Sequence, residues 1–353
     1  MTNIVQKFIL AAAIAAITGS LSLLASGQGT TPPPPPGAKP SKKSDPTATP
    51  PAPYEYKYKY STGGTYEKAI AVAPNVNFTL CVTEGNLKVN SWKRDEVRVY
   101  VDGGPKFSFK VIDKPPDGKP VWIQMTNLDP KAGYHSECIW GETIEIDVPA
   151  GTSLNLTGKA ITAQVDGLRK VGVQTIGGDI AIRNVKEGVK ANTYEGDITV
   201  DEAWGQVNLE TTTGNIVVVD SGPSDIGDTF KAVTRGGAIS LTRVTHRQQD
   251  VRSVSGSILF NGELKSGGTY AFNTTNGTIR LALPSMTSCK LSATFSVGRF
   301  SSDLPFKIET DNIAPANLKT LVGKLGSGGE ALLRLSTELG MIDIKKQLAS
   351  PTK

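Results

Sequence analysis

Six copies of one eight-residue motif occupy the middle of the chain and decide its fold. They read TIGGDIAI (175–182), TYEGDITV (193–200), TTTGNIVV (211–218), TRGGAISL (234–241), SVSGSILF (253–260) and TTNGTIRL (274–281). Successive motif glycines, from Gly178 to Gly277, lie 18, 18, 23, 19 and 21 residues apart. A repeat of about 20 residues is typical of a solenoid, in which each repeat forms one coil.

The apolar residues of each repeat recur with a spacing of two. An isoleucine stands two residues after each motif glycine, and another apolar residue stands two residues after the isoleucine. Before Gly214, Val207 and Leu209 show the same spacing. This spacing places the side chains on one face of a strand, whereas a helix requires a period of about 3.6. A propeller is disfavoured because its repeats run about 40–50 residues. Each repeat is therefore predicted to form a strand, a glycine corner, a second strand and a connection.

Strand pairs of this length cannot bury an apolar face alone, so the repeats must stack. Stacked strands lie about 4.8 Å apart, which places the isoleucines in one buried column. The sequence thus predicts an all-β fold, a parallel β-solenoid of about 20-residue coils. We expect a positive φ at each motif glycine, and we expect the Thr or Ser three residues earlier to satisfy backbone groups at the corner.

The repeats suggest the domain boundaries. Residues 158–346 are assigned to the solenoid and 347–353 to a tail, while 61–157 are predicted to form a β-rich N-terminal section that caps the first coil. Further copies of the motif, more degenerate or isolated, occur around Gly85, Gly298 and Gly340. The longer spacings predict insertions between coils around residues 221–225 and 245–249. Such insertions often gather on one face of a solenoid and carry its binding site.

The first 60 residues are interpreted as a targeting signal followed by a spacer. Residues 1–27 are predicted to be a signal peptide, because Lys7 precedes an apolar run that ends in small residues. An uncleaved membrane anchor is the alternative. Residues 28–60 are proline-rich and predicted to be a disordered linker, and the alternating stretch Tyr54–Tyr60 is expected to form a lead-in strand. We therefore expect an exported protein of the periplasm, the cell surface or the extracellular space.

Charge and composition exclude several functions. The net charge of +5 comes mostly from the leader and the linker, so the remaining chain has no basic stripe for nucleic acid. With two histidines and no CxxC motif, no metal or other cofactor is expected. In an exported protein, Cys81 and Cys138 are candidates for a disulfide with Cys289 as a buried free thiol, and three unpaired cysteines are the alternative.

Few residues are candidates for catalysis. Asp179 and Asp197 follow equivalent glycines and should stack about one strand spacing apart, which suits a retaining glycosidase or a calcium site. The same positions in later repeats are small turn-forming residues, so turn chemistry explains both aspartates. His135 lies near Cys138, where a structural role is expected, and His246 in a polar insertion is expected to be solvated. No catalytic residue is assigned.

The stretch GNLKVNSWKRDEVRVYV (85–101), followed by the glycine-centred coils, resembles the bacterial "putative adhesin" β-solenoid domain family, a domain of unknown function. The resemblance covers about residues 65–346, and the segment 322–344 is similar to the closing coil of that family. It implies surface adhesion and carries no catalytic residues. We therefore expect a non-enzymatic module that interacts with a cell-surface glycan or an envelope protein. A polysaccharide-acting enzyme and a periplasmic partner protein in envelope sensing are the alternatives.

Overall fold

The computed structural model describes residues 63–128, 137–225, 227–314 and 318–347. These residues form strands and turns, and none of them belongs to a helix that could cross a bilayer. The predicted signal peptide, the linker and the Tyr54–Tyr60 stretch lie outside the described residues, as does His135.

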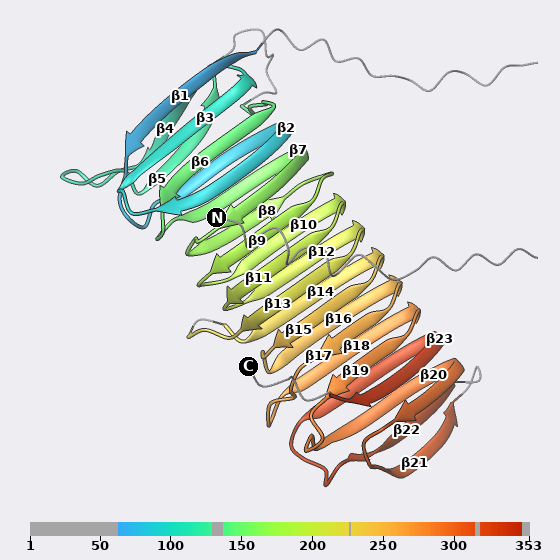
Figure 1. Cartoon of the computed structure of the whole chain (residues 1–353). Helices are drawn as coiled ribbons and strands as arrows, with labels where there is room; N and C mark the ends of the chain where they lie inside the picture. The colour runs from blue at the N-terminus through green and yellow to red at the C-terminus, as the bar shows by residue number, and fades with distance from the viewer. Residues whose placement is uncertain (1–62, 129–136, 226, 315–317, 348–353) are drawn as a thin grey trace, which may run out of the picture. The chain divides into compact units, whose positions relative to one another are not determined.

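The repeats form two parallel ladders of strands, one before and one after the motif glycines (Figure 1). The strands of the first sheet are β8 (Lys170–Gln174), β10 (Val189–Glu195), β12 (Val207–Thr213), β14 (Thr229–Gly236), β16 (Gln248–Ser255) and β18 (Thr269–Asn276). Those of the second sheet are β9 (Ile180–Val185), β11 (Ile198–Trp204), β13 (Ile216–Gly222), β15 (Ile239–Val244), β17 (Ile258–Asn261) and β19 (Ile279–Leu283). The predicted parallel β-solenoid is confirmed.

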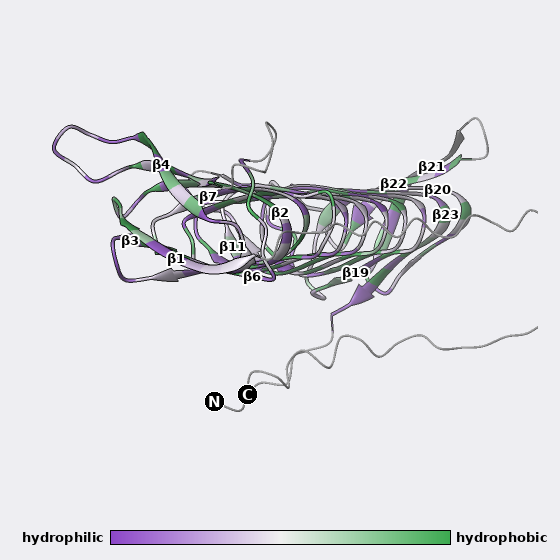
Figure 2. Ribbon diagram, turned by 90° about the horizontal axis from the view of Figure 1, so that it is seen from above, coloured by the Kyte–Doolittle hydropathy of each residue, from purple (hydrophilic) through white to green (hydrophobic). Residues whose placement is uncertain are grey.

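The core lies between the two sheets and consists of columns of equivalent side chains. Ile198 pairs in register with Ile216, and Ile216 with Ile239, and the six motif isoleucines are at most 1 % exposed. Each fully buried aliphatic side chain contributes about 1.5–3 kcal/mol. Hydrophobic and hydrophilic residues alternate along the strands as the spacing of two predicts (Figure 2).

The motif glycines are required because successive coils approach closely at the corner. A Cβ on Gly196 would lie 2.3 Å from the carbonyl oxygen of Gly178, and a Cβ on Gly237 would lie 2.0 Å from that of Gly214. Gly196 has a positive φ of 138°. The expectation of a positive φ is nevertheless wrong at three corners, those of Gly237, Gly256 and Gly277. The shared cause is therefore the lack of space for any side chain.

At five corners, the hydroxyl three residues before the glycine links neighbouring coils. Thr211 donates from Oγ1 to the carbonyl oxygen of Gly196 over 3.0 Å, and Thr234 donates to that of Gly214 over 2.9 Å. The same bond to the previous glycine is made by Ser253, Thr274 and Thr337. These five hydroxyl residues are at most 5 % exposed. The predicted role of the hydroxyl is confirmed at these five corners, where the acceptor lies on the adjacent coil. It does not hold at the first two motifs, because Thr193 donates to Glu195 of its own coil at 3.1 Å and Oγ1 of Thr175 has no partner among the described residues.

The N-terminal section contains one full coil and antiparallel strands that end the stack. β2 (Asn77–Trp92) bends at Gly85 and pairs in parallel with β7 (Ser153–Asp166), a strand that runs across the boundary expected at residue 157. On one side of β2 the order continues through β6 (Thr143–Pro149), β3 (Glu96–Gly104) and β1 (Gly64–Ala71). On that same side, away from β7, the first half of β2 pairs with β5 (Trp122–Asn127), and β5 pairs with β4 (Phe107–Asp113).

The C-terminal end does not follow the order of the sequence. β23 (Leu332–Lys346) lies between the β18 and β19 coil and β20 (Cys289–Ser302), although β20 precedes it in the chain. The coil around Gly340 is therefore not the closing coil that the family resemblance implied. Beyond β20 lie β22 (Leu318–Leu325) and β21 (Phe306–Ala314), which are antiparallel and end the stack (Figure 1).

Candidate functional site

The connections that lead from the second sheet to the first define one edge of the solenoid, which we call the insertion edge. Its longest members span residues 223–228 and 262–268, and the three-residue connection 245–247 lies between them. The first insertion was predicted from the sequence. The second insertion was expected at 245–249 but is shorter, because β16 already begins at Gln248. The longer connection at 262–268 was missed, although the 21 residues between Gly256 and Gly277 indicated it.

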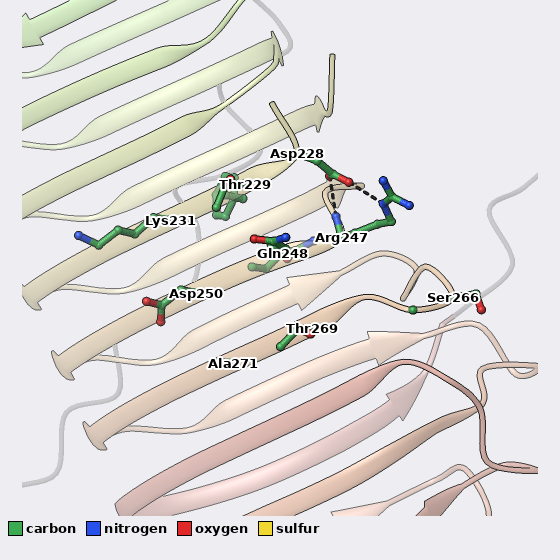
Figure 3. A pocket seen from close by; sticks show the side chains of 12 residues that line it. Asp228, Thr229, Lys231, Arg247, Gln248, Asp250, Ser266, Thr269 and Ala271 are labelled. Carbon is green, nitrogen blue, oxygen red and sulfur yellow. Dashed lines mark hydrogen bonds and ion pairs between the residues drawn. The ribbon is translucent and has the colours of Figure 1, made fainter. Parts of the chain in front are cut away.

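The insertion edge borders a groove of about 710 Å³ on the outer face of the first sheet (Figure 3). Thr229, Gln248 and Thr269 lie side by side at the starts of β14, β16 and β18, since the register pairs them directly. One step further along these strands, Lys231, Asp250 and Ala271 form a second row. The groove is thus a flat floor of hydroxyl, amide and charged groups repeated at the strand spacing.

One ion pair stands at the rim of the groove, between two connections. Arg247 donates from its backbone N and from Nε to the carboxylate of Asp228, over 2.8 Å and 2.6 Å. Burial raises the pKa of Asp228, but the side-chain and backbone hydrogen bonds from Arg247 outweigh it, so that the pKa lies below its usual value. The pair fixes the second connection to the first (Figure 3).

The other charged groups of the groove are also paired. Lys231 contacts the carboxylate of Glu210, and Asp250 accepts a hydrogen bond of 2.8 Å from Arg252. The lining therefore carries two positive and two negative side chains, Lys231 and Arg247 against Asp228 and Asp250. Such a surface suits a neutral polar ligand, because a charged ligand would have to displace a partner.

His246 lies beneath the insertion edge rather than on it. Its exposure is 0 %, so the expectation of a solvated imidazole is wrong. Its Nε2 lies 2.7 Å from the carbonyl oxygen of Gly205 and must carry the proton, since a carbonyl only accepts, and its ring packs against Phe230 at 5.6 Å between centroids. Burial lowers the pKa of His246, which keeps the ring neutral. The loop is thus anchored by its own histidine.

Gln249 completes the interior network and was missed in the sequence. It occupies the inward column in which neighbouring coils have Phe230 and Tyr270, and it is 3 % exposed. Its Nε2 donates to the carbonyl oxygens of Val244, at 3.1 Å, and His246, at 2.9 Å. The signal was available, because a glutamine seven residues before Gly256 breaks an otherwise apolar column.

The paired aspartates at the glycine corner are occupied by the backbone. Asp179 Oδ1 accepts a hydrogen bond of 2.9 Å from the N–H of Asp197, and Asp197 Oδ1 accepts one of 2.7 Å from the N–H of Asn215. Asn215 passes the pattern on to the N–H of Ala238 at 2.9 Å. These carboxylates serve as a ladder between coils, which is a structural role as expected, although the bonds join neighbouring coils and not residues of one turn. Within the described part of the chain, no three His, Cys, Asp or Glu residues are grouped to hold a metal ion.

The three cysteines form one disulfide and one free thiol, which was one of the two hypotheses from the sequence. A disulfide joins Cys81 on β2 to Cys138, with the two Cα atoms 4.4 Å apart, and Cys289 is free and buried. The bond holds the segment before β6 against β2, where Ile139 also pairs with Val82. Burial raises the pKa of the Cys289 thiol to about 12. The disulfide lies in the N-terminal section, apart from the groove.

The fold and the insertion edge together define the class of protein. It is a parallel β-solenoid whose coils are joined by connections of unequal length that border a polar groove. The chain belongs to the Toastrack DUF4097 family, whose sequence profile matches residues 77–344. No curated protein matches the chain. A crystal structure of a "putative cell adhesion protein" from Clostridium sporogenes ATCC 15579 shares 12 % identity, with 80 % of this chain and 100 % of that chain covered at a TM-score of 0.25. A similarity at this level adds nothing to the functional argument.

Proposed function

We propose that this protein is an exported, non-enzymatic, adhesin-like module that binds a cell-surface glycan or an envelope protein at its insertion edge. The observation that carries the proposal is the groove of about 710 Å³ formed where three successive connections meet three in-register strands. His246 and Gln249 anchor the middle connection from beneath by hydrogen bonds to backbone carbonyls, and a preorganised polar surface binds with little loss of entropy.

Two features support export. The sequence begins with a stretch that has the layout of a signal peptide, followed by a proline-rich spacer. The Cys81–Cys138 disulfide is typical of proteins in oxidising compartments outside the cytosol. Both features favour a module held at or beyond the cell envelope.

The rival proposal is a polysaccharide-acting enzyme on the same scaffold. It would use Asp179 and Asp197, but both carboxylates already accept backbone hydrogen bonds from the next coil. The rival predicts release of reducing or unsaturated sugar that disappears in Asp197→Asn. Such a result would replace the binding proposal, because Asn can still accept the backbone bond and so preserves the fold.

The binding proposal is tested by filling the groove. Ala271→Trp places a large side chain on the groove floor, and Ser292→Trp provides the control at the same outward position on β20, two coils away. The purified chain and both variants are applied to a glycan array and to a bacterial envelope fraction. We expect Ala271→Trp to lose at least about tenfold in affinity and Ser292→Trp to bind like the unmodified chain. Equal binding by both variants would remove the groove from the proposal, and recovery of one inner-membrane partner alone would favour a role in envelope sensing.

A further inference from the structure

A second hollow lies at the insertion edge, at the ends of β11, β13 and β15 in the second sheet. It is a cleft of about 530 Å³ lined by Trp204, Glu202, Asp220, Arg243 and Glu263, together with Thr245 and Gln347. None of these residues lines the groove of Figure 3. The cleft therefore constitutes a separate candidate site.

Trp204 is an exposed aromatic residue whose ring lies against the neighbouring coil. Its side chain is 46 % exposed, although most large aromatic residues of this solenoid are buried. Trp204 pairs in register with Gly222, and a Cβ on Gly222 would lie only 2.7 Å from Cζ3 of the indole. The indole ring thus covers Gly222, and any residue with a Cβ at position 222 would leave the ring no room. An indole has only two side-chain torsions and presents apolar surface that a ligand can cover at low entropic cost.

Beside this platform stands a planar pair of opposite charges. Arg243 donates to both oxygens of Asp220, from Nε to Oδ1 and from Nη2 to Oδ2, the second over 2.6 Å. The hydrogen bond from Arg243 lowers the pKa of Asp220, so the pair stays charged. A guanidinium has five N–H donors, so that Arg243 retains donors for a ligand, and a carboxylate retains lone pairs.

The cleft carries both donors and acceptors, with acceptors in excess. Glu202 is exposed and makes no ion pair within the described chain, and Glu263 pairs with Lys265 at 3.1 Å. Thr245 and Gln347 add a hydroxyl and an amide. Arg243 and Lys265 offset two of the three carboxylates and Glu202 remains, so the cleft carries a net charge of −1, which opposes uronic acids and other anionic ligands. A purely cationic ligand would in turn leave the donors of Arg243 unmatched.

We infer that the Trp204 cleft binds a neutral glycan, with one sugar ring on the indole and its hydroxyls on Glu202, Asp220 and Arg243. A sugar ring has an apolar C–H face, and each of its hydroxyls both donates and accepts, so that it matches a platform bordered by mixed polar groups. Glu202, Asp220 and Arg243 occupy equivalent positions in three successive coils, with φ values of 55°, 53° and 53°, so that the repeat itself brings the three polar groups together beside the indole. The inference rests on the proposed binding function and names its ligand class.

The test uses the purified chain, Trp204→Ala and a matched control on arrays of neutral, uronate-bearing and amine-bearing oligosaccharides. The control is Trp122→Ala, since Trp122 is 44 % exposed but lies on β5 in the N-terminal section. Neutral glycans that bind are then titrated by calorimetry. We expect Trp204→Ala to weaken binding by at least about tenfold, Trp204→Phe to restore part of it, and Trp122→Ala to leave it unchanged. Partial rescue by Phe separates an aromatic platform from a merely structural residue.

A second variant tests the charge argument. Glu202→Gln combined with Glu263→Gln removes two of the three negative charges, and we expect it to admit uronate-bearing glycans that the unmodified chain rejects. The inference is overturned if no neutral glycan binds, if Trp204→Ala and Trp122→Ala bind equally, or if only amine-bearing sugars bind. If the chain still binds envelope fractions in those cases, and Ala271→Trp still weakens that binding, the proposed function stands, and only the assignment of a neutral glycan to the Trp204 cleft is wrong.

Discussion

The glycine corner allows a sharp comparison between two adjacent residues of the same coil. A Cβ on Gly237 would lie 2.0 Å from the carbonyl oxygen of Gly214, about 1.4 Å short of the 3.4 Å at which ordinary contact begins. A Cβ on Gly236 would meet nothing nearer than the carbonyl oxygen of Thr212 at 3.8 Å. Gly237→Ala should therefore push two coils apart, whereas Gly236→Ala should be accommodated.

The size of the effect follows from the bonds at that corner. Moving the Gly214 peptide disturbs the hydrogen bond from its N–H to Gly236, at 2.9 Å, and the one that its carbonyl accepts from Thr234, also at 2.9 Å. Two hydrogen bonds at about 1 kcal/mol each, with about 1–3 kcal/mol for overpacking, give a loss of about 3–5 kcal/mol for Gly237→Ala. Gly236→Ala should lie between no change and a gain of about 1 kcal/mol, because alanine restricts the unfolded chain.

Urea unfolding followed by circular dichroism and by tryptophan fluorescence measures both variants. The comparison holds where the two probes give coincident transitions and the m-value is unchanged. Free energies of unfolding that differ by less than about 1 kcal/mol between the two variants would refute the reasoning. Close approach of the coils would then not be the reason for glycine at this position.

Three further outcomes follow from the same contacts. Thr234→Val should cost about 1–2 kcal/mol because the carbonyl of Gly214 loses its donor, while Thr234→Ser should stay within about 0.5 kcal/mol; equal urea midpoints for the two would contradict this. Burial lowers the pKa of His246 below the unfolded value of about 6.5, so the stability it contributes is present above that pH and is lost as the pH falls below it. His246→Gln should flatten the dependence of the urea midpoint between about pH 7 and pH 5, and an unchanged slope would assign the acid sensitivity to other groups. Because burial raises the pKa of Cys289 to about 12, a thiol reagent at about pH 8 should label this residue only after unfolding, and rapid labelling of the native chain would show that the thiol is accessible.

Much of the fold could be predicted from the sequence because its main determinant is local and repeated. The spacing of two between residues such as Ile198 and Val200 specifies a strand face, and the recurrence of Gly196 one coil later as Gly214 specifies where strands turn. The close contact between successive coils could not be predicted from the sequence, because it depends on the distance between backbone segments that are 18 or more residues apart in the chain. The expected reason for glycine was therefore only partly right.

The site was harder to predict than the scaffold. The connection at 223–228 could be expected from the repeat spacing, but a spacing does not say whether a side chain in a connection turns inward. His246 was placed in solvent because its neighbours are polar, yet the backbone carbonyl of Gly205 and the ring of Phe230 surround it. Trp204 received no interpretation from the sequence, because a single aromatic residue at the end of a strand does not reveal that Gly222 leaves room for its ring.

The position of β23 determines when the fold can be completed during synthesis. Coils up to β19 can add to the stack one after another as the chain emerges, because each new coil meets only the coil before it. β20 emerges next, but its neighbour in the finished stack, β23, is made afterwards. β20 can therefore reach its final neighbour only after β23 has been synthesised and has paired with β18 and β19. A chain that stops before Leu332 retains almost all of its coils and yet lacks the strand to which its own end attaches.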